Sequence, residues 1–251
     1  MYHKLYLVLA KALFISILIV VLPSCKKEDG EVFKKPVGQV QLKEIRVDNQ
    51  IRHSFIYHQT ELAEERWFGF DCKNTPTDVF IYVYQQGKLT SLETTLRSLY
   101  SSTAALCDPN TGITTEESYE YDTQGRLHKT IRDNSYTIYD YTTSGLVAKQ
   151  TLYSSSGTII STTHFRHDAR GNIIEEQDAQ GNSTQYEYDD QPNPFYLIKQ
   201  KPGWISAYNK SPNNVLKASG AVTFDRTIEY FPNGLPRRVL ENGVYYTYHY
   251  E

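Results

Sequence analysis

The sequence is poor in the residues that mark most catalytic and redox centres. Its 251 residues include three cysteines, two tryptophans and one methionine. It contains no G-x-S-x-G elbow, H-E-x-x-H motif, paired C-x-x-C, P-loop or G-x-G-x-x-G fingerprint. These absences remove the usual signatures of serine hydrolysis, zinc hydrolysis and nucleotide binding, and we expect no cofactor, no metal and no enzymatic activity.

Helical patterning is also missing. No window sustains apolar residues at a period of 3.6. Tyrosine occurs 21 times, and threonine and isoleucine are frequent. Aromatic and β-branched residues suit a pleated, half-buried surface. The sequence therefore predicts an all-β fold.

The N-terminus reads as a targeting segment. Residues 1–24 contain Lys4 and Lys11, no acidic residue, and an apolar run over 12–22 that is short for a transmembrane helix. The run ends in LPSC, which resembles the lipobox of bacterial lipoproteins. That resemblance implies cleavage of a lipoprotein signal peptide before Cys25 and acylation of that cysteine. An uncleaved signal anchor is the alternative.

Residues 25–36 are predicted to be a tether. The segment after Cys25 reads KKEDGE, which resembles an export tag of surface lipoproteins, although a solvated linker would look the same. We expect the protein in the cell envelope, as an outer-membrane lipoprotein exposed at the cell surface. Its membrane contact would be the lipid anchor.

Charge and the remaining cysteines add two expectations. Without residues 1–24 the chain has 24 basic and 29 acidic residues, a net charge of −5. This balance argues against a nucleic-acid partner, which needs clustered positive charge. Cys72 and Cys107 would lie in an oxidising compartment, so they either form a disulfide or remain two buried thiols.

The segment YEYDTQGRL, residues 119–127, predicts a hairpin. Tyr119 and Tyr121 leave the same face of a strand. Asp122 begins a turn and accepts hydrogen bonds from the backbone, while Gly125 supplies a left-handed conformation. Looser copies recur along the chain at Tyr82/Tyr84, Tyr139/Tyr141, Phe165/His167, Tyr186/Tyr188 and Ile228/Tyr230, and Tyr246, Tyr248 and Tyr250 end it.

These copies resemble the YD repeat, also called the RHS repeat. The match is clearest over 117–190, although Thr142 replaces the turn aspartate in one copy and PNPF replaces Gly-Arg-Leu in another. With the lipobox, the chain resembles bacterial surface lipoproteins of unknown function that have a barrel-like, porin-like repeat fold. The resemblance implies a shell or scaffold and no enzymatic activity.

Turn signals predict a dozen or more strands in one domain over 37–251. Twisted open sheets rarely exceed about 10 strands without curling, so we expect an antiparallel meander that forms a curled open sheet or a barrel-like fold. The alternative is a membrane-spanning barrel, which needs an outward apolar band. Segments such as 175–178 offer no apolar face, and we favour the meander in water.

Residues 189–221 break the rhythm and are predicted to be a long loop. The aromatic residues of this loop have two interpretations: they plug the interior of the sheet, or they form a ligand-binding platform. The candidate ligand-binding residues are Phe195, Tyr196, Trp204 and Tyr208. A second irregular stretch spans 99–115.

Two functions remain open. The first is a lipid-anchored, non-enzymatic scaffold or binding module for a polysaccharide or a protein partner. The second is an envelope hydrolase that uses carboxylates on the concave face of the sheet. His164 and His167 are expected on opposite faces of one strand, which disfavours joint metal binding.

Overall fold

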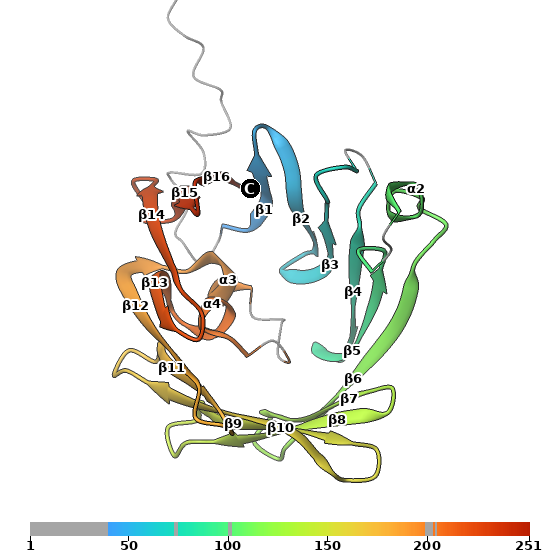
Figure 1. Cartoon of the computed structure of the whole chain (residues 1–251), viewed down its shortest axis with the longest axis vertical. Coiled ribbons are helices and arrows are strands. Elements are labelled where there is room, and N and C mark those ends of the chain that lie inside the picture. Colours follow the sequence, from blue (N-terminus) through green and yellow to red (C-terminus); the bar gives the residue numbers. More distant parts are fainter. Residues whose placement is uncertain (1–39, 73–74, 100–101, 199–202, 204) are drawn as a thin grey trace, which may run out of the picture.

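The sheet closes on itself. A computed structural model describes residues 40–72, 75–99, 102–198, 203 and 205–251. Its sixteen antiparallel strands form a closed barrel in which each strand pairs with its neighbours along the chain, and β1 pairs with β16 to complete the ring (Figure 1). The predicted all-β meander is confirmed, and the barrel-like alternative is the one adopted.

The strands are short, with six to ten residues each. They are β1 (Leu42–Val47), β2 (Gln50–His58), β3 (Glu61–Trp67), β4 (Asp78–Gln85), β5 (Lys88–Leu96), β6 (Ile113–Tyr121), β7 (Leu127–Arg132), β8 (Ser135–Tyr141), β9 (Val147–Ser154), β10 (Ile159–His167), β11 (Ile173–Asp178), β12 (Ser183–Pro192), β13 (Asn213–Gly220), β14 (Phe224–Tyr230), β15 (Pro236–Glu241) and β16 (Val244–Tyr250).

Because consecutive strands are antiparallel, their connections alternate between two rims. One rim, here called the aspartate rim, carries the turns at 59–60, 86–87, 122–126, 142–146, 168–172 and 231–235, the segment 193–212, and both ends of the described barrel. The other, here called the disulfide rim, carries 48–49, 68–77, 97–112, 133–134, 155–158, 179–182, 221–223 and 242–243.

The alternation of the strands decides what fills the barrel. The first aromatic of the repeat points inward and is buried at Tyr82, Tyr119, Tyr139 and Phe165, and is half-buried at Tyr186. The residue that follows it points outward because successive side chains on a strand leave opposite faces. The repeat therefore makes both the core and the outer wall.

The segment expected to be a loop over 189–221 is shorter in the structure. β12 runs to Pro192 and β13 covers Asn213–Gly220, and the described residues between these strands include the short helices α3 (Pro194–Leu197) and α4 (Ala207–Lys210). The pairing of β12 with β13 shifts register beside Glu187 and again after Tyr188, and these bulges disturb the strict alternation by which strands are recognised. Figure 1 shows α3 and α4 inside the ring of strands. We call the described residues of 193–212 the plug.

The second irregular stretch includes α2 (Thr103–Leu106), and β6 begins before the stretch ends. Cys72 and Cys107 form a disulfide here, with Cα atoms 5.3 Å apart, joining the connections at 68–77 and 97–112. The Arg97 side chain donates hydrogen bonds to the carbonyls of Pro76, Pro109 and Thr111 in the same two connections. The disulfide and Arg97 thus tie together the two longest connections of their rim.

No helix in the described part of the chain is long and apolar enough to cross a membrane.

Candidate functional site

The turn of the repeat is built by one carboxylate. Oδ1 of Asp122 accepts hydrogen bonds from the amides of Gln124 and Arg126, at 2.9 Å each, and Oδ2 accepts from the Arg126 guanidinium at 2.8 Å. The hydrogen bond from the Arg126 amide is the largest cause of a lowered Asp122 pKa. Gly125 has φ +78°, as its left-handed role required. Thr142 replaces the aspartate in the next copy, and its hydroxyl accepts from the amide of Leu146 at 3.1 Å.

The second tyrosine of the repeat joins neighbouring hairpins. Its hydroxyl donates to the backbone carbonyl of the first or second residue of the preceding strand. The links are Tyr84 to Leu62 at 3.0 Å, Tyr121 to Leu89 at 2.9 Å, Tyr141 to Leu127 at 2.6 Å, Tyr188 to Ile173, and Tyr250 to Pro236 at 2.9 Å. His167 occupies this column on β10 and Tyr230 donates instead to Asp189. The column therefore forms a series of hydrogen bonds along the aspartate rim.

The residue between the two aromatics makes an ion pair on the outer wall. Glu120 lies 3.9 Å from Lys129, and Asp140 lies 2.6 Å from Lys149, each across a strand pair. The same relationship recurs, with the charges reversed in one case, at Arg166–Glu175 (2.9 Å), Glu187–Lys217 (3.7 Å) and Glu229–Arg238 (3.7 Å). The outer wall is thus charged along both β6–β13 and β14–β15.

The plug is fixed at its entry by a buried asparagine. Asn193 is 3% exposed and caps α3, where its Oδ1 accepts from the Phe195 amide at 3.0 Å. Its Nδ2 donates to the carbonyls of Tyr208 and Ser211 at the far end of the plug. A proline at the first helical position favours the start of a helix there. Asn193 therefore links the two ends of the plug.

A hydrogen bond from the wall secures the other helix. Oε1 of Glu176, on β11, accepts from the amide of Ala207 at 2.8 Å, at the start of α4. Burial raises the pKa of the Glu176 carboxyl, while hydrogen bonds from Ala207 and Tyr186 oppose that rise. A general acid needs a raised pKa, so Glu176 is the strongest candidate among the inward carboxyls. Its Oε1, however, already accepts the hydrogen bond that secures the plug.

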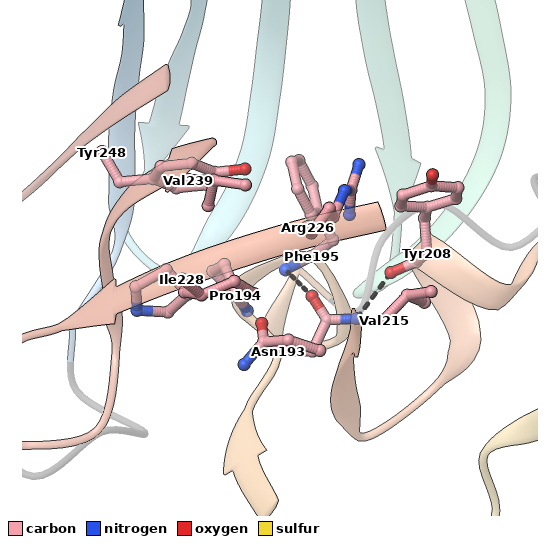
Figure 2. A pocket seen from close by; sticks show the side chains of 11 residues that line it. Asn193, Pro194, Phe195, Tyr208, Val215, Arg226, Ile228, Val239 and Tyr248 are labelled. Carbon is pink, nitrogen blue, oxygen red and sulfur yellow. Dashed lines mark hydrogen bonds between the residues drawn. The ribbon is translucent and has the colours of Figure 1, made fainter. Parts of the chain in front are cut away.

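A small pocket lies between the plug and the wall, shown in Figure 2. Arg226 is its charged side chain, which pairs with Glu241 at 2.6 Å and lies 4.2 Å from the centre of the Tyr208 ring. The pocket has room for about one water molecule. It is lined by Asn193, Pro194, Phe195, Tyr208, Asn214, Val215, Arg226, Ile228, Pro236, Val239 and Tyr248. It is a packing defect rather than a ligand site.

The structure describes three of the four candidate ligand-binding residues. Phe195 packs edge to face against both Phe55 and Tyr248, and Tyr208 packs against Phe224. Tyr196 is 42% exposed. Trp204 lies outside the described residues. Phe195 and Tyr208 thus lie inside the barrel, as in the plug interpretation, and do not share an exposed platform with Tyr196.

The inward carboxylates have structural partners, although Oε1 of Glu117 is buried without a hydrogen-bond partner among the described residues. Apart from Glu176, they are Glu65 with Trp67 at 2.7 Å, Asp78 with Ser98 at 2.7 Å, Glu117 with Arg132 at 3.1 Å, and Glu241 with Arg226. In the described ranges, no three His, Cys, Asp or Glu residues gather in a way that could hold a metal ion. His164 is exposed and lies opposite the exposed Gln177 of β11. His167 is half-buried, and this burial lowers the pKa of its imidazole.

Sequence reasoning missed a set of buried amides. Asp189 accepts from the backbone and the side-chain amide of Asn214, and Asn172 exchanges hydrogen bonds with Asn213. These contacts tie the base of the plug to the aspartate rim. The Asn-Pro pair at 193–194 was an available signal only for the cap of α3, because it is typical of a helix start.

Comparison with known proteins locates the repeat. Residues 167–193 match the RHS repeat family model. No curated protein sequence matches the chain. Among solved structures, the chain is similar to a porin-like protein from Bacteroides uniformis, with 11% identity, a TM-score of 0.47, and coverage of 84% of this chain and 95% of that one.

A second solved structure is the Photorhabdus luminescens Tc holotoxin pore. It shows 12% identity and a TM-score of 0.31 over 75% of this chain, but the match covers only 9% of the toxin chain. The turn at 168–172 and the strands β11 and β12 fall within residues 167–193, the range that matches the RHS repeat model. The chain thus carries an RHS repeat at residues 167–193, as part of a closed sixteen-strand barrel.

Proposed function

We propose that this chain is a lipid-anchored, non-enzymatic scaffold or binding module of the bacterial cell envelope. Residues 1–24 are its lipoprotein signal peptide, and Cys25 is its acylation site at the head of a tether over 25–36. Both lie outside the described residues, and the lipobox LPSC is what supports them. The β-repeat domain over 37–251 is the exposed working part.

The observation that carries this proposal is the division of the barrel into a filled interior and a charged wall. The plug and the inward aromatics fill the concave inner face of the sheet, which is where the substrate cleft of a hydrolase would have to lie. Outside, the cross-strand ion pairs from Glu120–Lys129 to Glu229–Arg238 would face lipid if the barrel spanned a membrane. Each lysine or arginine placed against lipid at the membrane midplane would cost about 2–4 kcal/mol. A wall of this kind supports a barrel in water, held at the membrane by its lipid.

The anchor is tested by metabolic labelling with a fatty acid, followed by protease treatment of intact cells. The wild-type chain should take up the label, fractionate with the outer membrane and be shaved from the cell surface. Cys25→Ser should abolish labelling and release the chain from the membrane. Retention of Cys25→Ser at the membrane would contradict lipid anchoring and favour an uncleaved signal anchor.

The non-enzymatic role is tested against the hydrolase alternative. Cell-wall glycans and surface polysaccharides incubated with the full chain should show no turnover, and a glycan array reports whether a polysaccharide binds. Turnover that is lost in Glu176→Gln but kept in the outer-wall variant Glu175→Gln would overturn the scaffold proposal. Turnover is the decisive readout because a buried structural carboxyl has no reason to support it.

A further inference from the structure

The backbone pairing between β13 and β14 stops early. These strands pair in register only through Lys217–Asp225 and Ala218–Phe224, at the end of the junction nearer to the disulfide rim. No other pair of neighbouring strands in the described barrel has so short a ladder. The rest of both strands, toward the aspartate rim, lies outside this register. The ring is therefore closed here by fewer backbone hydrogen bonds than at its other junctions.

Each of the two strands is held by its other neighbour. Residues 213–216 of β13 lie along β12, and residues 226–230 of β14 lie along β15. We call the junction between 213–216 and 226–230 the seam. The seam thus separates two parts of the sheet that are each laddered on the far side.

The ion pairs beside the seam stay on one side of it. Lys217 of β13 lies 3.7 Å from Glu187 of β12, and Arg226 of β14 lies 2.6 Å from Glu241 of β15. Neither pair joins β13 to β14. Separation of the two strands would therefore leave both pairs intact.

The pocket of Figure 2 lies along the inner side of the seam. Its lining includes Asn214 and Val215 from β13 and Arg226 and Ile228 from β14. Protein interiors are close-packed, so a space of this kind marks a place where two elements fit poorly. The missing backbone pairing thus coincides with the packing defect between the plug and the wall.

A tyrosine spans the open end of the seam. The hydroxyl of Tyr230, the last residue of β14, donates to Oδ2 of Asp189 on β12. Asp189 also accepts from the backbone and side-chain amides of Asn214 on β13, at 3.1 Å each. Elsewhere in this column the tyrosine hydroxyl reaches the backbone of the adjacent strand, whereas Tyr230 reaches across β13 to a carboxylate. A side-chain link thus stands where the ladder is missing.

We infer that the barrel opens locally at the seam, and that the hydrogen bond from Tyr230 to Asp189 is the latch that holds it closed. Local opening breaks few backbone hydrogen bonds, so it requires much less free energy than unfolding of the whole sheet. Opening connects the pocket beside the plug with the outside of the barrel. This device depends neither on the lipid anchor nor on the absence of enzymatic activity.

Thiol labelling of the native full chain tests the seam. Val215 and Ala218 are 1% and 0% exposed on the same strand, but only Ala218 is paired with β14. Val215→Cys should react with a maleimide at least about tenfold faster than Ala218→Cys, because local opening exposes the first position and leaves the ladder at the second intact. Mass spectrometry of the labelled peptide locates the reaction, and the Cys72–Cys107 disulfide is left unreduced.

The latch is tested in the Val215→Cys chain. Tyr230→Phe removes a hydrogen bond to a carboxylate and should raise the labelling rate about tenfold. Tyr121→Phe is the matched control, because it removes a hydroxyl from the same column that donates to the carbonyl of Leu89, far from the seam. It should leave the rate unchanged.

Urea separates local opening from unfolding. The dependence of a free energy on urea scales with the surface exposed, so low urea should change labelling of Val215→Cys little and labelling of Ala218→Cys steeply. Equal rates at the two cysteines, an equally steep dependence on urea, or equal acceleration by Tyr230→Phe and Tyr121→Phe would overturn the inference. Circular dichroism identifies a Tyr230→Phe variant that fails to fold, and the comparison of the two cysteines in the chain that retains Tyr230 then decides.

Discussion

The hydroxyl of Tyr141 donates a 2.6 Å hydrogen bond to the backbone carbonyl of Leu127 in the preceding hairpin. Tyr141→Phe removes this link while keeping the ring, so it should lower the free energy of unfolding by about 1 kcal/mol. Urea unfolding followed by circular dichroism measures the change. Tyr136→Phe, on the outer wall, is the matched control and should be close to neutral. Equal effects of the two variants would mean that the column of tyrosine hydroxyls does not stabilise the barrel.

Alkaline pH should unfold the barrel. Burial is the main cause that raises the pKa of Tyr139, Tyr141 and Tyr248 to about 12. The folded state therefore favours the neutral phenols, and their contribution to stability is complete below pH ~10, where unfolded tyrosine titrates, and is lost as the pH rises through about 12.

Phenolate absorbance and circular dichroism recorded in one titration test this expectation. We expect the buried tyrosines to ionise together with the loss of sheet structure, above the pH at which free tyrosine titrates. Gradual ionisation of all tyrosines near pH ~10 in a barrel that stays folded would contradict it.

Gly125 should resist substitution for a purely conformational reason. Its φ is +78°, and a Cβ added there would meet no atom within 4 Å. Gly125→Val should nevertheless destabilise by about 1–2 kcal/mol, because a β-branched residue disfavours the left-handed region. Gly125→Asn should cost less, since asparagine adopts this region more readily. A valine variant with unchanged melting would show that the turn adapts.

Loss of the disulfide should loosen the rim that it braces. Cys72 and Cys107 are 35 residues apart in sequence, and closing a loop of that size contributes about 3–4 kcal/mol in the chain-entropy model. Cys72→Ser with Cys107→Ser should lower Tm by several degrees. Thiol labelling of the denatured, unreduced wild-type chain should find neither cysteine free, and labelling of both would contradict the pairing.

Asn193 should control retention of the plug. Asn193→Ala removes the cap of α3 and leaves the carbonyls of Tyr208 and Ser211 without this donor, so we expect a loss of about 2–3 kcal/mol. Limited proteolysis should then cut within 193–212 before the barrel unfolds. Asn110→Ala, in the exposed turn where Asn110 donates to Asp108, is the control and should leave the plug protected.

The sequence by itself determined the repeating hairpin. The alternation of Tyr119 and Tyr121, the aspartate turn at Asp122 and the left-handed Gly125 are all set by contacts within a few residues. Local hydrogen bonds and the twofold period of a strand need no knowledge of the rest of the fold. For the same reason the all-β class and the meander could be predicted.

Only the tertiary structure decided closure and the plug. Whether β1 meets β16 depends on the number, tilt and stagger of all sixteen strands, which no single repeat encodes. The positions of Phe195 and Tyr208 depend on Asn193 and Glu176, the latter 31 residues from its partner Ala207. The short ladder between β13 and β14 likewise appears only when the barrel is assembled. Closure and the position of the plug therefore depend on contacts between residues far apart in sequence, because the same local hairpins are compatible with an open sheet.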